Sequence, residues 1–196
     1  YSEALFLEKF LGGVDYYERI KKMVRSTYNR IPIHKKCGVV YNSWMNGPDQ
    51  DIYDKGGLMM HSLRVLVDND SLFFSALKQI QIDFREQNVS SEEMKEKLNT
   101  LLGFDCSPMM NWYLDEAKPP QLQIRLDLPN SKLYYKWKKE IPLMVKQQLE
   151  LECEDSLYMI NPTTEFQFMK REPGNRIAFS LEKGIYYQID VLEIIK

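Results

Sequence analysis

The residues best suited to chemistry lie in the stretch Asp68-Asn69-Asp70-Ser71-Leu72-Phe73. An acid stands three residues before a small hydroxyl residue, where an apolar run, Leu63 to Val67, gives way to a segment with helical periodicity. A nucleophile at the start of a helix has backbone N–H groups beside it, and these can stabilise an oxyanion. The spacing therefore makes Ser71 a candidate nucleophile and Asp68 a candidate supporting acid.

A serine nucleophile also needs a base, because an unassisted hydroxyl reacts poorly near neutral pH. The chain has two histidines, His34 and His61, and both precede Ser71. A simpler interpretation is that Ser71 caps a helix and Asp68 belongs to the preceding turn. Taken alone, the stretch is compatible with both interpretations.

Periodicity and capping signals predict that the first half of the chain is helical. Tyr16, Ile20 and Met23 recur at helical spacing. Ser90 and Glu93 have the spacing of a capping box, and Gly103 is well placed to end the helix that follows. In chain order, the predicted helices span 1–11, 14–30, 71–87, 90–103, 131–140 and 142–152.

The second half is predicted to hold a small sheet. Residues 121–128 alternate between apolar and polar side chains, which is typical of a half-buried strand. Further strands are predicted at 157–160, 165–169, 176–181 and 185–195. Residues 31–57 are predicted to be a long irregular excursion, with a short strand at 38–41 and turns at 46–51 and 54–57. The predicted fold class is α+β, with a helical N-terminal half packed on a mostly antiparallel C-terminal sheet.

The composition argues against several kinds of partner and cofactor. Hydrophobic residues make up 44% of the 196 residues, and the net charge is −2, so neither nucleic acid nor an anionic membrane is an expected partner. No apolar run approaches the roughly 20 residues that span a bilayer. The three cysteines, Cys37, Cys106 and Cys153, contain no CxxC pair. We therefore expect no metal site, no cofactor and a reducing, intracellular setting, cytoplasmic or nuclear.

The stretch that begins at Asp68 resembles the nucleophile loop of the ovarian-tumour (OTU) cysteine proteases, which are mostly deubiquitinases. That loop has the form Asp-Gly-Asn-Cys-Leu-Phe-Arg-Ala. Asp68, Leu72 and Phe73 match it in register, and Ser71 stands at the position of the cysteine. The order of elements near the C-terminus is also similar, and Tyr186 falls where the family has its catalytic histidine.

The resemblance implies an OTU-like domain over 61–196, preceded by a helical or irregular extension over 1–60, or one continuous domain. Asp68, Ser71 and Tyr186 would then be the positions of a degenerate catalytic triad. An unperturbed tyrosine has a pKa of about 10 and cannot act as a general base near neutral pH. The implied function is therefore a catalytically inactive module for protein binding or scaffolding, with ubiquitin as the partner that the family implies.

Two alternatives remain open. The protein is an active OTU-like deubiquitinase whose nucleophile has been replaced by Ser71, and His34 or His61 supplies the base. Otherwise it is an unrelated α+β interaction domain, in which the helix over 14–30 contacts a partner through Tyr16, Tyr17 and Met23. The sequence does not decide whether the protein is an enzyme.

Overall fold

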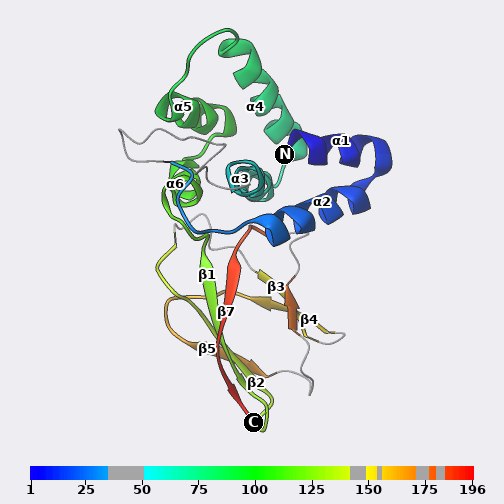
Figure 1. Ribbon diagram of the computed structural model, residues 1–196, viewed down its shortest axis with the longest axis vertical. Coiled ribbons are helices and arrows are strands. Elements are labelled where there is room, and N and C mark those ends of the chain that lie inside the picture. The colour runs from blue at the N-terminus through cyan, green and yellow to red at the C-terminus, as the bar shows by residue number, and fades with distance from the viewer. Residues whose placement is uncertain (35–50, 142–148, 154–155, 171–176, 180–183) are drawn as a thin grey trace.

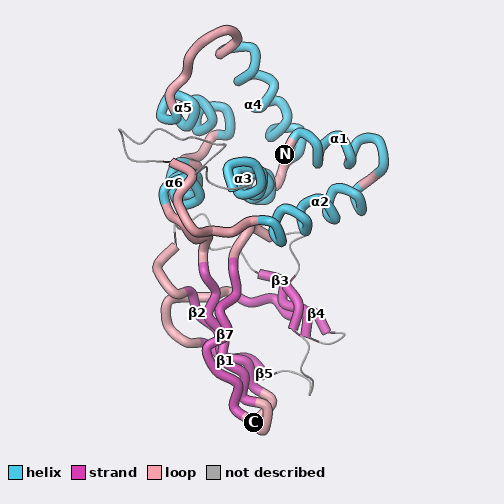
Figure 2. The backbone as a smooth tube through the Cα atoms, viewed as in Figure 1, coloured by secondary structure: helices cyan, strands magenta, loops and turns pink. Residues whose placement is uncertain are grey.

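The computed structural model describes residues 1–34, 51–141, 149–153, 156–170, 177–179 and 184–196. The strand predicted at 38–41 and residues 46–50 of the turn predicted at 46–51 lie outside these ranges. Helices gather at one end of the molecule and strands at the other (Figures 1 and 2). Because the helices come first and the strands follow, the predicted α+β class is confirmed.

Six helices lie within the described ranges. Helix α3 occupies the middle of the helical half, where Figure 1 shows it nearly end-on with the other helices around it. Its neighbours include α2, α4 and α6. The helices are α1 (Ser2–Leu11), α2 (Gly13–Ser26), α3 (Asp51–Val67), α4 (Asp70–Asp83), α5 (Ser91–Leu102) and α6 (Ser107–Asp115).

The helix ends show which local signals were decisive. Ser90 and Glu93 form the predicted capping box at the start of α5, and Gly103 ends that helix in the left-handed conformation with φ 78°. The turn predicted at 54–57 is wrong, because α3 already begins at Asp51. A Cβ atom on Gly57 would lie 2.9 Å from the sulfur of Met23, so this glycine lets α2 and α3 approach closely. Tertiary packing here outweighs the low helix propensity of glycine.

The strands form two sheets. The larger has the order β5-β2-β1-β7, with β1 antiparallel to β2 and parallel to β7, and β2 antiparallel to β5. The smaller has the order β4-β3-β6 and is antiparallel. The strands are β1 (Gln121–Asp127), β2 (Lys132–Trp137), β3 (Leu149–Cys153), β4 (Ser156–Ile160), β5 (Gln167–Lys170), β6 (Ile177–Phe179) and β7 (Gln188–Ile195).

The helix predicted at 131–140 is wrong, because this segment contains strand β2. Leu133, Tyr135 and Trp137 alternate with exposed or half-buried neighbours, and all three are buried. They pair with Leu126, Ile124 and Leu122 of β1, so pairing with this neighbouring strand decides the local structure. The helix predicted at 142–152 also fails where it can be compared, since residues 149–153 form β3. Residues 142–148 lie outside the described part of the chain.

Buried side chains of the helices and of the sheets form one continuous hydrophobic cluster. It extends from Ala4 of α1 to Tyr187, just before β7. The boundary predicted between residues 60 and 61 falls inside α3. Among the described helices, none combines the length and apolar character needed to cross a membrane.

Candidate functional site

Residues 68–71 form the connection between α3 and α4, and their polar groups cap these helices. Asp68 has a left-handed φ of 46° and its N–H donates to the carbonyl oxygen of Arg64, which ends α3. Asn69 is the N-cap of α4, and its Oδ1 accepts from the N–H of Leu72 at 3.0 Å. Asp70 pairs with Arg64 at 2.6 Å. We call residues 68–71 the α3–α4 turn.

Among the described residues, no hydrogen bond or ion pair joins the three predicted triad positions. Ser71 is exposed near the start of α4, whereas Tyr186 is buried and lies just before β7. The hydroxyl of Tyr186 accepts from Nδ2 of Asn29 at 2.8 Å, and the N–H of Asn29 donates to Asp51 at the other end of α3. Helix α3 has 17 residues and spans about 25 Å. Ser71 therefore lies beyond one end of α3, and the Tyr186 hydroxyl lies toward the other.

The two histidines are engaged elsewhere. His61 is buried in α3, with Nδ1 2.8 Å from the hydroxyl of Tyr16. His34 has its Nδ1 2.9 Å from a carboxylate oxygen of Asp115. Neither forms a described hydrogen bond with Ser71, so the geometry shows no base at this serine in the part of the chain that the structure describes.

Buried charges gather instead at the N-terminal end of α3. Asp51 is 1% exposed, and its two carboxylate oxygens accept from the backbone N–H groups of Tyr28 and Asn29, both at 2.7 Å. An acid in the first turn also interacts favourably with the helix dipole. Asn29 has a left-handed φ of 54°, which turns the chain after α2 onto the carboxylate. Asp51 thus fastens the segment after α2 to the start of α3.

Lys55 is fully buried one turn further along α3. Its Nζ donates to the carbonyl oxygens of Glu116 and Ala117, at 2.5 and 2.9 Å, just past the end of α6. Free carbonyl groups at a helix C-terminus favour a cation. Burial lowers the pKa of Lys55 to about 8, and the carboxylates of Asp51 and Glu116 oppose this shift. Lys55 therefore links α3 to the segment that leads into β1.

Asp54 lies between these two residues and is 1% exposed. One carboxylate oxygen accepts from the hydroxyl of Ser26 at 2.6 Å. The other is 3.9 Å from a guanidinium nitrogen of Arg19, and no described residue donates a hydrogen bond to it. The side-chain oxygen of Asn29 is likewise buried without a described donor. Buried acceptors of this kind are uncommon in folded proteins.

The segment before β7 completes the arrangement. The N–H of Tyr186 donates to Oγ of Ser62 at 2.9 Å, and its carbonyl oxygen accepts from the hydroxyl of Tyr113 at 2.5 Å. Burial raises the pKa of the Tyr186 hydroxyl. We call this polar cluster, which joins four chain segments, the α3 junction. It comprises Asn29, Asp51, Asp54, Lys55 and Tyr186.

Two exposed aromatic side chains lie next to residues of the α3 junction in the sequence. Tyr53 is 71% exposed, although Asp51, Asp54 and Lys55 around it in the sequence are buried. Tyr28 is 56% exposed, and the guanidinium of Arg30 lies 5.0 Å from its ring centre. The sequence prediction does not include this region, because it assigns 54–57 to a turn. The available signal was the set Asp51, Asp54 and Lys55, spaced three and four residues apart as on one face of a helix.

The α+β fold, in which helices are followed by sheets, has counterparts among solved structures. No protein-family model and no curated protein matches the chain. One similar structure is aminopeptidase A of Legionella pneumophila in complex with aspartic acid, with a TM-score of 0.54 and 12% sequence identity. The match covers 95% of this chain and 22% of the aminopeptidase chain. The likeness is one of fold. Within the described ranges, no three His, Cys, Asp or Glu side chains come together in a way that could hold a metal ion.

Proposed function

We propose that this chain is a segment of an aminopeptidase-like protein, in which the α3 junction positions Tyr53 and Tyr28 on a peptide-binding surface. The observation that carries the proposal is the fold likeness to aminopeptidase A, which extends over 95% of this chain. The chain spans only about a fifth of that enzyme, 22% of its length, so the proposal assigns it a part of such a protein and not the whole reaction.

The geometry of Tyr53 supports a role in binding. A phenol offers an apolar ring and a hydroxyl that can donate to a peptide carbonyl. A recognition group is most effective when its backbone is held in place before the ligand arrives. The buried side chains of Asp51, Asp54 and Lys55 hold the first turns of α3 in this way. The backbone that carries the exposed ring of Tyr53 therefore loses little conformational freedom when a ligand binds.

The substitution Tyr53→Phe tests this proposal, since it removes only the hydroxyl. We expect the affinity for a short peptide with a free amino terminus to fall about fivefold, the worth of one net hydrogen bond. Tyr134→Phe is the matched control, because Tyr134 lies in β2 against Phe168. Isothermal titration calorimetry of the full chain gives the affinities. Equal affinities of the two variants, or no peptide binding at all, would contradict the proposal.

A second candidate function is a non-catalytic module for protein binding, in the intracellular setting that the cysteines predict. The observation that favours it is an exposed apolar surface where α1 meets α2. Phe6, Phe10, Leu11 and Val14 are 58%, 60%, 64% and 78% exposed. Apolar side chains that cluster on a surface are typical of interaction sites. The interface first predicted on 14–30 is not available as stated, because Tyr16 and Met23 are buried in the core.

Ubiquitin is the partner to test on this surface, because the OTU resemblance implies it. We expect the double substitution Phe10→Ser and Val14→Ser to abolish binding of ubiquitin while the chain stays folded, since both side chains are exposed. Titration with labelled ubiquitin measures the binding, and circular dichroism confirms the fold. If the unmodified chain binds no ubiquitin, this version of the second candidate is wrong.

A further inference from the structure

The larger sheet has one face in the hydrophobic core and one face that remains accessible. Along β2, every second side chain is buried, and the side chains between them are half-buried. In β5, Phe168 and Lys170 are exposed. We call the accessible surface of these two strands the β2–β5 face. It comprises Lys132, Tyr134, Lys136, Phe166, Phe168 and Lys170.

Two lysines meet at one end of the β2–β5 face. Lys132 and Lys170 are directly opposite each other in the antiparallel register of β2 and β5, so their side chains lie on the same side of the sheet. Like charges in this arrangement destabilise a strand pair. Asp127 is opposite Lys132 on β1, but its carboxylate accepts from the backbone N–H and from Nδ2 of Asn130. An anion bound between the two lysines would relieve their repulsion.

Aromatic rings hold the cations of this face in place. Nζ of Lys132 lies 5.0 Å from the ring centre of Phe168, and Nζ of Lys136 lies 4.6 Å from that of Phe166. A cation over a ring is attracted by the negative face of the π system. The guanidinium of Arg125 is also 5.1 Å from the ring centre of Phe166. Because cations already cover these rings, a ligand would meet positive charge before it meets a free aromatic surface.

The neighbouring half of the same sheet is neutralised. Nε of Arg125 in β1 lies 2.8 Å from a carboxylate oxygen of Glu193 in β7, and Gln123 donates to Asp190 at 3.4 Å. The ion pairs among the described residues include none of the three lysines of the β2–β5 face. The positive charge is therefore local. Since the whole chain has a net charge of −2, it suits a short acidic segment better than a long polyanion.

We propose that the β2–β5 face binds an extended acidic segment of a partner protein, with two acids four residues apart and an apolar side chain midway between them. Lys132 and Lys136 are about 13 Å apart along their strand, and alternate side chains of an extended peptide point the same way. The first acid of the segment lies between Lys132 and Lys170, and the second pairs with Lys136. The apolar side chain between them packs on Phe168, which is 57% exposed.

The proposal is independent of the peptide surface at Tyr53, because it involves different residues and needs no free amino terminus. The probe is acetyl-Gly-Glu-Ser-Leu-Ser-Glu-Gly-amide, which is blocked at both ends. The control peptide, acetyl-Gly-Glu-Glu-Ser-Leu-Ser-Gly-amide, has the same composition with adjacent acids. Backbone NMR shifts of the full chain are recorded in low-salt buffer, because salt weakens exposed ion pairs. We expect the probe to shift residues 132–136 and 167–170, and the control peptide to bind about fivefold more weakly.

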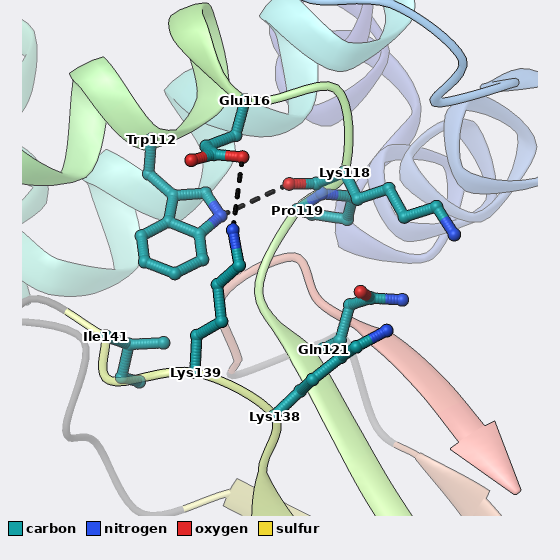
Figure 3. A pocket seen from close by; sticks show the side chains of 8 residues that line it. All are labelled: Trp112, Glu116, Lys118, Pro119, Gln121, Lys138, Lys139 and Ile141. Carbon is teal, nitrogen blue, oxygen red and sulfur yellow. Dashed lines mark hydrogen bonds and ion pairs between the residues drawn. The ribbon is translucent and has the colours of Figure 1, made fainter. Parts of the chain in front are cut away.

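Variants of single lysines identify the contacts. Lys132→Gln and Lys136→Gln should each weaken binding of the probe about fivefold, the effect of one exposed ion pair. Lys139→Gln is the matched control and should leave the affinity unchanged, because Nζ of this neighbouring lysine lies 3.5 Å from Glu116, at the end of α6 (Figure 3). Tyr53→Phe should also leave it unchanged, which separates this proposal from the peptide surface at Tyr53.

Several results would overturn the proposal. One is a probe that shifts no residue of the β2–β5 face. Another is equal binding of the two peptides, and a third is an equal effect of Lys132→Gln and Lys139→Gln, since either would show that net charge alone attracts the ligand. Single-stranded oligothymidylate is titrated in parallel. If it binds the β2–β5 face and the probe does not, the partner is a nucleic acid and the proposal is wrong.

Discussion

The two ends of helix α3 both carry acids, yet they are built in different ways. At the C-terminal end, Asp68 and Asp70 are exposed and take part in a turn between two helices. At the N-terminal end, Asp51 and Asp54 are 1% exposed and hold neighbouring segments of the chain. The residues that look most like a catalytic motif thus lie at the end where the polar groups are solvated.

Burial decides how much a polar residue contributes to the stability of the fold. An exposed acid in a capped turn is solvated in the folded and unfolded states, so its removal costs little. A buried acid has lost its water and depends on its hydrogen bonds, so its removal leaves donors unpaired. The α3 junction should therefore dominate stability, and the α3–α4 turn should contribute only its capping interactions and the exposed Arg64–Asp70 ion pair.

The largest expected effect follows from Asp51→Ala. This change leaves the N–H groups of Tyr28 and Asn29 without their acceptor, and the free energy of unfolding should fall by about 2–4 kcal/mol. Asp70→Ala at the other end is the matched control and should cost at most about 1 kcal/mol, because its side chain is 60% exposed. Urea denaturation measures both. Equal losses would remove the distinction between the two ends.

The pH dependence of stability should report Lys55. Its pKa is about 8 in the folded chain and 10.5 in its unperturbed state, so between these values the unfolded chain binds more protons. Stability from this group should therefore rise with pH, by about 2 kcal/mol from pH 8 to pH 10. Denaturation of the Lys55→Met variant over the same range should lack this rise. Parallel pH profiles for the two proteins would contradict the assignment.

Another effect has the opposite sign and begins below pH 10. Burial raises the pKa of Tyr113 above its usual value, so the folded chain holds the phenolic proton longer than the unfolded chain does. The contribution of this group falls as the pH rises past the unperturbed pKa of about 10. Burial also raises the pKa of Cys106 from 9.0 to about 11, and this contribution likewise falls between pH 8 and pH 10. The contribution of Lys55 is therefore the difference between the pH profiles of the unmodified chain and the Lys55→Met variant.

The smallest effects separate two residues of the α3–α4 turn. Asn69→Ala removes the N-cap of α4 and should cost about 1 kcal/mol. Ser71→Ala should change the free energy of unfolding by less than about 0.5 kcal/mol, because Ser71 is exposed and a different residue caps the helix. Thermal denaturation of both variants measures these changes in the free energy of unfolding. A larger loss from Ser71→Ala would mean that this serine has a role that the described contacts do not include.

Much of the fold could be predicted because local signals agree with it. The capping box at Ser90, the glycine stop at Gly103 and the alternation in 121–127 depend on neighbours in the sequence. The turn predicted at 54–57 and the helix predicted at 131–140 are wrong, because in both cases a distant segment of the chain decides the local structure. Gly57 is helical because α3 packs closely on Met23, and Lys132–Trp137 is a strand because β1 and β5 flank it.

The candidate site was harder to predict for the same reason. The partners of Asp51 are 22 and 23 residues away, and those of Lys55 are 61 and 62 residues away. No local pattern shows that these groups meet. The stretch 68–71, by contrast, is conspicuous in the sequence because capping residues and catalytic residues are the same small polar types.

The most direct test of the account is a map of where a peptide with a free amino terminus binds. Backbone NMR shifts of the full chain, recorded during titration with a short peptide, give this map. We expect the largest shifts at residues 28–30 and 52–55, around the α3 junction, and we expect Ser71→Ala to leave them unchanged. Largest shifts at residues 68–72, lost in the Ser71→Ala variant, would contradict it and return the functional site to the α3–α4 turn.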